Sequence, residues 1–350
     1  MGSARPFACL FLSLAATVAL VGSVSASAAT NTNPKHFFWA AGQSPQGTAN
    51  SVANDIIYHG GALGDGAIGV QVKPAVYLVY WGPQWASGFT TADTDGTLYS
   101  SKTLQSYLNS FFTNVGGSPW AGVQTQYCRN VAVGATSCAG LPGAEFIKNP
   151  THQLKGVWTD PTPVPSDIVT LGLAQNLVND PIAAEAMRAS AHFKYDPYAT
   201  YIVLTPPSTI ATGQPAYCGY HTQTTSIDGY GNPYRIEYAF IPFLNMDWPG
   251  VGTGGCGMHN VNATSDAFGN GIFDGYSIVT GHEYSEAVTD PDNFFSNQDG
   301  WNDAQGSENA DKCAWIETQN ITLAGQQFAV QPTWSNEAFD AGKDGCAVSR

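Results

Sequence analysis

The sequence has 350 residues and a formal net charge of −14 at pH 7, with 27 acidic residues against 13 basic ones. This acidic balance disfavours nucleic acid and anionic membrane surfaces as partners. Hydrophobic residues make up 43% of the chain, which is enough to bury a large core.

The N-terminus has the features of a cleavable signal peptide over residues 1–28. Arg5 supplies a positive charge, an apolar stretch runs from Phe7 to Val21, and Ala26-Ser27-Ala28 offers the small residues that signal peptidase accepts. The apolar stretch is too short to span a bilayer comfortably. We therefore expect a secreted, extracellular protein without membrane contact after cleavage.

The first half of the remaining chain alternates irregular, strand and helix patterns. Residues 29–54 are polar and lack hydrophobic periodicity, which predicts a flexible N-terminal arm or a short pro-segment. Val70–Trp81 is rich in β-branched and aromatic residues and predicts a buried strand around Tyr77–Tyr80. Ser101–Val115 repeats apolar residues at helical spacing, and the glycine pair that follows predicts the end of that helix.

The second half continues this mixture. A helical pattern covers Ser166–Ala191 with a break at Asp180-Pro181, and Thr200–Thr205 predicts a central strand. Tyr238–Leu244 predicts a strand that Pro242 moves toward an edge, and the last forty residues predict short strands separated by turns. Residues 55–350 are therefore expected to form a single α+β or three-layer α/β domain with a mixed β-sheet.

Six cysteines remain once Cys9 is removed with the signal peptide. An even set in an exported chain predicts three disulfides, and the absence of C-x-x-C spacing disfavours a zinc site built on thiolates. Several pairings are open to six cysteines. Because each pair is then nearest in sequence, we expect Cys128–Cys138, Cys218–Cys256 and Cys313–Cys346.

The most informative segment is FDGYSIVTGHEYSEAVTDP, residues 273–291, which predicts one helix with Asp274 as its N-cap. His282 and Glu286 are four residues apart, so both project from one face and can meet one ion. Glu283 then lies beside that ion, as the general base does in the metalloprotease H-E-x-x-H helix. Glu286 takes the place of the second histidine, which is chemically allowed because carboxylate oxygens also bind zinc, and harder ions such as manganese or calcium become competitive. The alternative is a chance histidine on an ordinary helix.

Later residues offer further ligands for the same ion. Glu308 is our first choice for the third metal ligand, and Asp292 is its rival because it follows His282 at the spacing that some zinc proteases use. Asp311 is expected to orient a ligand or to replace one.

His221 would serve as a hydrogen-bond donor to a transition state or as an extra ligand, although a purely structural role for it is equally open. His59 and His259 lie in glycine-rich loops and have equal claims, whereas His36, His152 and His192 have no supporting context.

Several of these segments together resemble the plant Exordium and phosphate-induced proteins and their bacterial secreted relatives. The resemblance spans roughly residues 55–316 and is carried by YHGG, VYLVYWG, CGYHT, HEYSEAVTDP and ENADKCAW. It implies a secreted or cell-wall-associated protein with a zincin-like HExxE helix, and no defined activity. This chain has Asp290 before Pro291 where the plant pattern has asparagine.

Three functions follow from these residues. The first is a metal-dependent, zinc-favoured endopeptidase that acts on a protein or peptide with a metal-bound water and Glu283 as base. The second is a non-catalytic extracellular protein of the Exordium type that binds a cell-wall component or a signalling partner. The third is a metal-free glycosidase that uses two carboxylates as acid and base.

Overall fold

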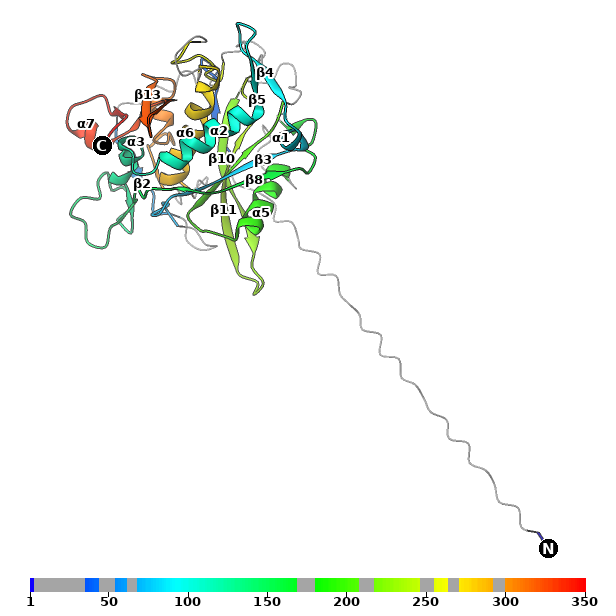
Figure 1. Cartoon of the computed structure of the whole chain (residues 1–350). Coiled ribbons are helices and arrows are strands. Elements are labelled where there is room, and N and C mark those ends of the chain that lie inside the picture. Colours follow the sequence, from blue (N-terminus) through cyan, green and yellow to red (C-terminus); the bar gives the residue numbers. More distant parts are fainter. Residues whose placement is uncertain are drawn as a thin grey trace.

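The computed structural model describes residues 1–2, 35–43, 54–61, 68–168, 180–207, 217–245, 255–263, 271–291 and 300–350. Its centre is a sheet of six strands in the order β1-β10-β11-β9-β3-β8 (Figure 1). The strands are β1 (His36–Trp39), β10 (Tyr217–Ile227), β11 (Pro233–Ile241), β9 (Ala199–Leu204), β3 (Ala75–Trp81) and β8 (Leu154–Asp160).

This sheet is mixed, as the sequence predicts. Strands β11, β9, β3 and β8 run parallel to one another, whereas β10 is antiparallel to both β1 and β11. Both β3 and β9 are buried along their whole length, which is the environment that continuous apolar runs require. The expected α+β architecture with a mixed sheet is therefore confirmed.

Two expectations, one for a strand and one for the N-terminal arm, need correction. β11 lies between β10 and β9, and so it is an interior strand and not an edge strand. Pro242 does not disturb the ladder because the strand ends at Ile241, one residue before the proline. The arm expected over residues 29–54 contains β1, which forms one edge of the sheet, and so it is not flexible throughout.

Helices cover both faces of the sheet. α6 (Asp274–Thr289) and α5 (Pro181–Phe193) both contact β9, β10 and β11. Gly219 of β10 faces α6, whereas the neighbouring Tyr220 lies on the side of Asp180, the N-cap of α5. Because consecutive strand residues point to opposite faces, the two helices lie on opposite sides of the sheet. α2 (Ser101–Asn114) packs against α6 (Figure 1).

The helix boundaries follow from local chemistry. The Ser100 hydroxyl accepts a hydrogen bond from the backbone N–H of Thr103 at 3.2 Å and caps α2, whose predicted range is confirmed. At the predicted break, Asp180 caps α5 through the N–H of Ile182 at 2.8 Å, and Pro181 occupies the first turn. Residues 169–179 of that predicted helical stretch lie outside the described residues.

α6 begins differently from the prediction. Asp274 is the first helical residue and Phe273 takes the cap position, so Asp274 is not the N-cap. Its carboxylate accepts hydrogen bonds from the backbone N–H groups of Val261 and Asn262, at 2.8 and 2.7 Å. Asp274 thus ties the loop that precedes the helix to the helix start.

Short elements complete the domain. Two of the short strands predicted near the C-terminus are confirmed as β13 (Gln319–Leu323) and β14 (Gln326–Val330), and these two strands pair with each other. The others are β2 (Ile57–Tyr58), α1 (Pro83–Ser87), β4 (Thr90–Ala92), β5 (Leu98–Ser100), α3 (Pro119–Gly122), η1 (Val123–Gln126), β6 (Cys128–Arg129), β7 (Glu145–Phe146), η2 (Gly271–Phe273), β12 (Trp301–Asn302), η3 (Asp311–Cys313), β15 (Thr333–Trp334), α7 (Asn336–Asp340) and β16 (Cys346–Ala347).

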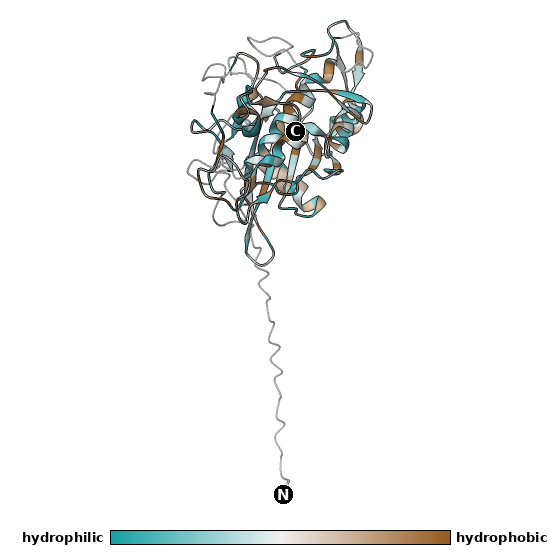
Figure 2. Ribbon diagram, turned by 90° about the vertical axis from the view of Figure 1, so that its left-hand side faces the viewer, coloured by the Kyte–Doolittle hydropathy of each residue, from teal (hydrophilic) through white to brown (hydrophobic). Residues whose placement is uncertain are grey.

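The three predicted disulfides are present, with the expected sequential pairing Cys128–Cys138, Cys218–Cys256 and Cys313–Cys346. The central strands and helices carry the apolar, brown segments of Figure 2 and form one continuous core. Every residue of α6 is buried, although the helix carries histidine, glutamate, serine and threonine. A polar helix in the middle of a core needs internal partners for those side chains.

Candidate metal centre

The side chains of His282, Glu283 and Glu286 project from the middle of α6 and are almost completely buried. Nε2 of His282 lies 3.0 Å from Oε1 of Glu286, one turn further along the helix. Close packing fixes the helix: a Cβ on Gly275 would lie 2.0 Å from the backbone oxygen of Cys256, and one on Gly281 3.1 Å from the Trp120 ring. The helix therefore presents these three groups from a rigid position.

The sheet contributes His221 and Glu237. Nδ1 of His221 lies 2.9 Å from Oε1 of Glu237 on the adjacent strand β11, and Nε2 lies 2.8 Å from Oε2 of Glu308. The same Nε2 atom is 3.6 Å from Oε2 of Glu286. His221 thus lies inside strand β10, and it connects the sheet to the helix and to the later segment.

The segment that starts at Glu308 closes the opposite side. Glu308 is fully buried, and the backbone N–H of Asp311 donates to Oε1 of Glu286 at 3.0 Å. Oδ1 of Asp311 lies 3.6 Å from Nε2 of His282. The segment is anchored by the Cys313–Cys346 disulfide and by Lys312, whose buried ammonium lies 2.9 Å from Oδ2 of Asp303.

β1 supplies two further side chains. Nδ1 of His36 lies 2.8 Å from Oε1 of Glu308, and the imidazole is 27% exposed. The ring of Phe38 stacks on the ring of His282, with centroids 3.8 Å apart and an interplanar angle of 13°. Nothing in the sequence indicated that His36 belongs to this cluster. Its position depends on the pairing of β1 with β10, two strands that are far apart in the sequence.

These histidine and carboxylate groups, most of them buried, could hold a metal ion. Within the described residues, three sets bring one ligand atom from each member within 4.8 Å of the others: His282 with Glu286 and Asp311, His221 with Glu283 and Glu286, and His36 with His221 and Glu308. Nitrogen and carboxylate oxygen are the donors that zinc accepts, and carboxylates also suit harder ions. The predicted residues His282, Glu283, Glu286, Glu308, Asp311 and His221 therefore converge, whereas Asp292 lies outside the described residues.

Burial dominates the protonation of the helix residues. It raises the pKa of Glu283 well above the usual value, and the nearby Glu286 raises it further. Burial also raises the pKa of Glu286, together with Glu308, and lowers the pKa of His282 to about 4. Burial and the nearby Glu286 also raise the pKa of Asp311, to about 7. All three carboxyl groups, Glu283, Glu286 and Asp311, therefore hold their protons more tightly than usual. A bound cation would offset that cost.

The Glu308 side of the cluster has the opposite balance. Burial opposes its charge, but His36 and His221 outweigh burial and hold the pKa of Glu308 well below its usual range. In return Glu308 raises the pKa of His36 to about 9, although burial alone would lower it. The pKa of His221 is likewise raised by Glu308 and Glu237 against the effect of burial. Protonated His221 is therefore a hydrogen-bond donor at neutral pH.

Glu283 and His282 are the residues of the cluster whose polar side-chain atoms all lack a hydrogen-bond partner among the described residues. Both carboxylate oxygens of Glu283 are also buried. A Cβ on Gly219 of β10 would lie 2.8 Å from Oε1 of Glu283, so a larger residue at this position would require the carboxylate or the strand to move. Glu237 and Gly219 were not predicted as site residues, and the CGYHT segment was the only signal that pointed near them.

The carboxylate of Asp290 has a structural role. It accepts hydrogen bonds from the backbone N–H of Gly300 at 2.6 Å and from Nδ2 of Asn302 at 3.0 Å. These bonds hold the chain after α6 beside β12. Asp290 thus fixes the helix end and stands apart from the three candidate ligand sets.

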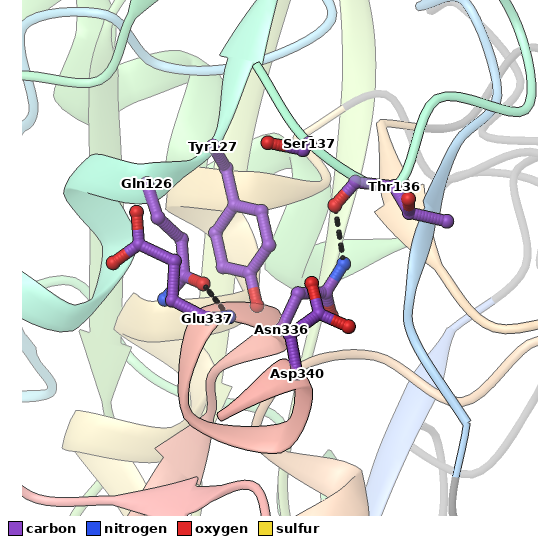
Figure 3. A pocket seen from close by; sticks show the side chains of 7 residues that line it. All are labelled: Gln126, Tyr127, Thr136, Ser137, Asn336, Glu337 and Asp340. Atoms are coloured by element: carbon purple, nitrogen blue, oxygen red, sulfur yellow. Dashed lines mark hydrogen bonds between the residues drawn. The ribbon is translucent and has the colours of Figure 1, made fainter. Parts of the chain in front are cut away.

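A small polar hollow lies between η1 and α7, and none of the metal-centre residues lines it (Figure 3). Nδ2 of Asn336 donates to the backbone oxygens of Ile56 and Thr136, at 2.7 and 2.8 Å. Oε1 of Gln126 accepts from the backbone N–H of Glu337 at 3.0 Å. Because these buried amides are used to hold α7, the hollow is part of the scaffold.

No family model, curated protein or solved structure matches this chain. Among the described residues, none of the helices combines the length and the apolar character that crossing a membrane requires. The three disulfides fit a protein that folds in an oxidising compartment. The function of the candidate metal centre therefore follows from the chemistry and geometry of its own residues.

Proposed function

We propose that this protein is a secreted, zinc-dependent endopeptidase in which Glu283 is the general base. The observation that carries the proposal is the buried carboxylate of Glu283, which has no hydrogen-bond partner among the described residues and lies beside His282 and Glu286. Burying a polar group without a hydrogen-bond partner lowers the stability of the folded protein. We therefore infer that the Glu283 carboxylate interacts with a ligand or a reactant.

His282 and Glu286 would hold the ion, and Asp311 or Glu308 would complete the set. The fit rests on the 3.0 Å approach of His282 to Glu286, whose geometry is not that of a hydrogen bond. Two donor atoms that face one another in this way suit a shared cation. A neutral imidazole with two carboxylates favours zinc, and it leaves manganese and calcium as competitors.

The reaction would divide between the ion and the protein. A divalent ion acts as a Lewis acid on the scissile carbonyl and makes a nearby water more acidic. Glu283 would accept a proton from the attacking water and pass it to the leaving amine. His221, oriented by Glu237 and Glu308, would donate a hydrogen bond to the oxygen that becomes negative.

Secretion is part of the same proposal. The three disulfides and the signal-like residues 1–28 support export, and the resemblance to Exordium-type proteins supports an extracellular or cell-wall setting. The substrate class would be a protein or peptide. The acidic net charge of −14 makes nucleic acid an unsuitable partner.

A second candidate is a non-catalytic extracellular protein with a structural ion. The observation that favours it is the complete burial of His221, His282, Glu283 and Glu308, which keeps these four side chains out of contact with solvent while β1 is in place. In that case the ion would stabilise the core, and Glu283 would be replaceable without loss of binding.

Glu283→Gln separates the two candidates. We expect this variant to retain zinc and to lose at least a hundredfold in peptide hydrolysis, measured in the intact chain and in a chain cut between β1 and β2. The exposed Glu317 provides a matched control, since Glu317→Gln makes the same chemical change away from the site. If zinc is bound but neither form of the wild-type protein cleaves any peptide of a broad library, the peptidase proposal fails and the structural ion remains.

A further inference from the structure

β1 lies along the outer edge of β10 and covers the candidate metal centre. The two strands are antiparallel, with His36 opposite His221 and Phe38 opposite Gly219. Because alternate residues of a strand face the same side, His36 and Phe38 both point toward α6. Phe37, between them, contacts the rings of Tyr217 and Tyr220 and belongs to the other face.

The two inward side chains fill the approach to the site. Phe38 is 2% exposed and lies between the ring of His282, at 3.8 Å, and the ring of Trp315, at 4.7 Å. His36 reaches Glu308 and is partly exposed, so it marks the boundary between the buried cluster and the solvent. A substrate carbonyl could reach Glu283 from this side only if β1 were absent.

The edge of β10 is suited to an extended chain. Without β1, the backbone N–H and C=O groups of Tyr217–His221 on that side would lack strand partners, and such an edge recruits another strand. Main-chain hydrogen bonds then give affinity, and alternate side chains give specificity. The positions of Phe38 and His36 mark where two alternate side chains of a bound peptide would enter.

Only the polypeptide chain links β1 covalently to the rest of the domain, because no disulfide joins them. Residues 29–54 contain no cysteine. Lys35 forms a buried ion pair with Asp180 at 2.8 Å, the indole N–H of Trp315 donates to the backbone oxygen of Trp39 at 2.9 Å, and the N–H of Ala41 donates to Gly255 at 3.1 Å. After a single cut behind β1, only non-covalent contacts would retain it, among them these three, the pairing with β10, and the contacts of His36 and Phe38.

We propose that β1 occupies the place of an extended peptide substrate on the edge of β10, so that the chain inhibits itself until β1 is released. The inference rests on the proposed peptidase function and names its substrate class: a peptide in β-conformation that runs antiparallel to β10, with an aromatic side chain over His282. Cys218–Cys256 anchors the start of β10 independently of β1, so the edge persists after release.

The test places a recognition sequence for a highly specific endoprotease between residues 43 and 54 of the full chain. A matched control carries the same sequence in the exposed loop at residues 140–143. After cutting, loss of the N-terminal fragment is checked by mass spectrometry, and the fold is checked by circular dichroism. We expect kcat/KM for an unstructured peptide pool to rise at least tenfold after the first cut and to stay constant after the control cut.

A second readout does not depend on hydrolysis. A labelled peptide of residues 35–43 should bind the cut chain in fluorescence anisotropy, compete with substrate peptides and inhibit hydrolysis, whereas a scrambled peptide should do neither. The intact variant Phe38→Ala should gain activity, and Phe37→Ala, on the opposite face of the same strand, should not. These variants keep the test valid if the cut chain unfolds.

The outcomes separate the two proposals. Equal activity before and after the cut in a zinc-loaded, folded protein, or no rebinding of the peptide, overturns the inference and leaves the peptidase function in place. Rebinding of the peptide without hydrolysis in any form overturns the peptidase function and leaves the β10 edge as a peptide-binding surface.

Discussion

Nε2 of His282 lies 3.0 Å from Oε1 of Glu286, one helical turn away, without the geometry of a hydrogen bond. Because burial lowers the pKa of His282 to about 4, the imidazole is neutral at physiological pH and has a lone pair to offer. Two groups with lone pairs repel at this distance unless a proton or a cation lies between them. The helix thus prepares a position for a positive charge inside the core.

Gly219→Ala should displace the proposed base without removing a ligand. Its Cβ would lie 2.8 Å from Oε1 of Glu283 and 2.9 Å from Cγ1 of Val279, so the carboxylate or the strand must move. Overpacking of this kind costs about 1–3 kcal/mol. We expect retained zinc, activity at least tenfold lower and reduced unfolding free energy, measured by elemental analysis, kinetics and urea denaturation.

Gly229→Ala is the matched control, because a Cβ there meets nothing within 4 Å. That variant should behave as the wild type in all three measurements. If Gly219→Ala had full activity, the contact between β10 and Glu283 would not position the base.

The Cys313–Cys346 disulfide should support metal binding, because it anchors the segment that carries Glu308 and Asp311. Replacing both cysteines by alanine removes a loop closure of 33 residues, worth roughly 4 kcal/mol, and we expect at least tenfold weaker zinc binding. Removing Cys128–Cys138, which closes 10 residues, should cost roughly 3 kcal/mol and leave zinc affinity unchanged. Calorimetric zinc titration of the two folded double variants checks this, and equal affinities would contradict it.

Glu185 should make stability depend on pH on the far side of the sheet from the metal centre. Burial raises its pKa to about 8, against the attraction of Arg188 and with the help of Asp160. A carboxyl group whose pKa is raised on folding stabilises the protein fully below its unfolded value of 4.5, and this contribution is lost as the pH rises through 8. The wild type should therefore lose roughly 1–3 kcal/mol between pH 5 and pH 8.5 through this group.

Glu185→Gln resembles the protonated form and should remove that part of the pH dependence. Urea unfolding at both pH values measures it, with the exposed Glu317→Gln as the control that should follow the wild type. A Glu185→Gln profile parallel to that of the wild type would show that the carboxylate is ionised without cost in the folded state.

Local patterns in the sequence were sufficient for the elements that depend on near neighbours. The spacing of apolar residues predicted α2, the run of β-branched residues predicted β3 and β9, and the nearest-neighbour cysteine pairing was confirmed. The spacing of His282 and Glu286 predicted a shared face on α6, which follows from helix geometry alone.

Contacts between distant segments could not be predicted in this way. The place of His36 depends on the pairing of β1 with β10, and Glu237 reaches His221 because β11 pairs with β10 in a register that brings the two residues together. The sequence around β1 is polar on both sides, and a strand of four residues leaves too short a pattern for periodicity. The convergence of Glu308 with the helix likewise depends on a turn and a disulfide that bring the segment back to α6.

The zinc content of the purified, exported protein at neutral pH tests the metal centre most directly. Elemental analysis would be run on the wild type, on His282→Ala and on His152→Ala, which alters an exposed histidine. We expect about one zinc per chain in the wild type and in His152→Ala, and none in His282→Ala. A wild-type protein that carries no metal after zinc has been supplied, or a His282→Ala variant that keeps it, would contradict the metal centre.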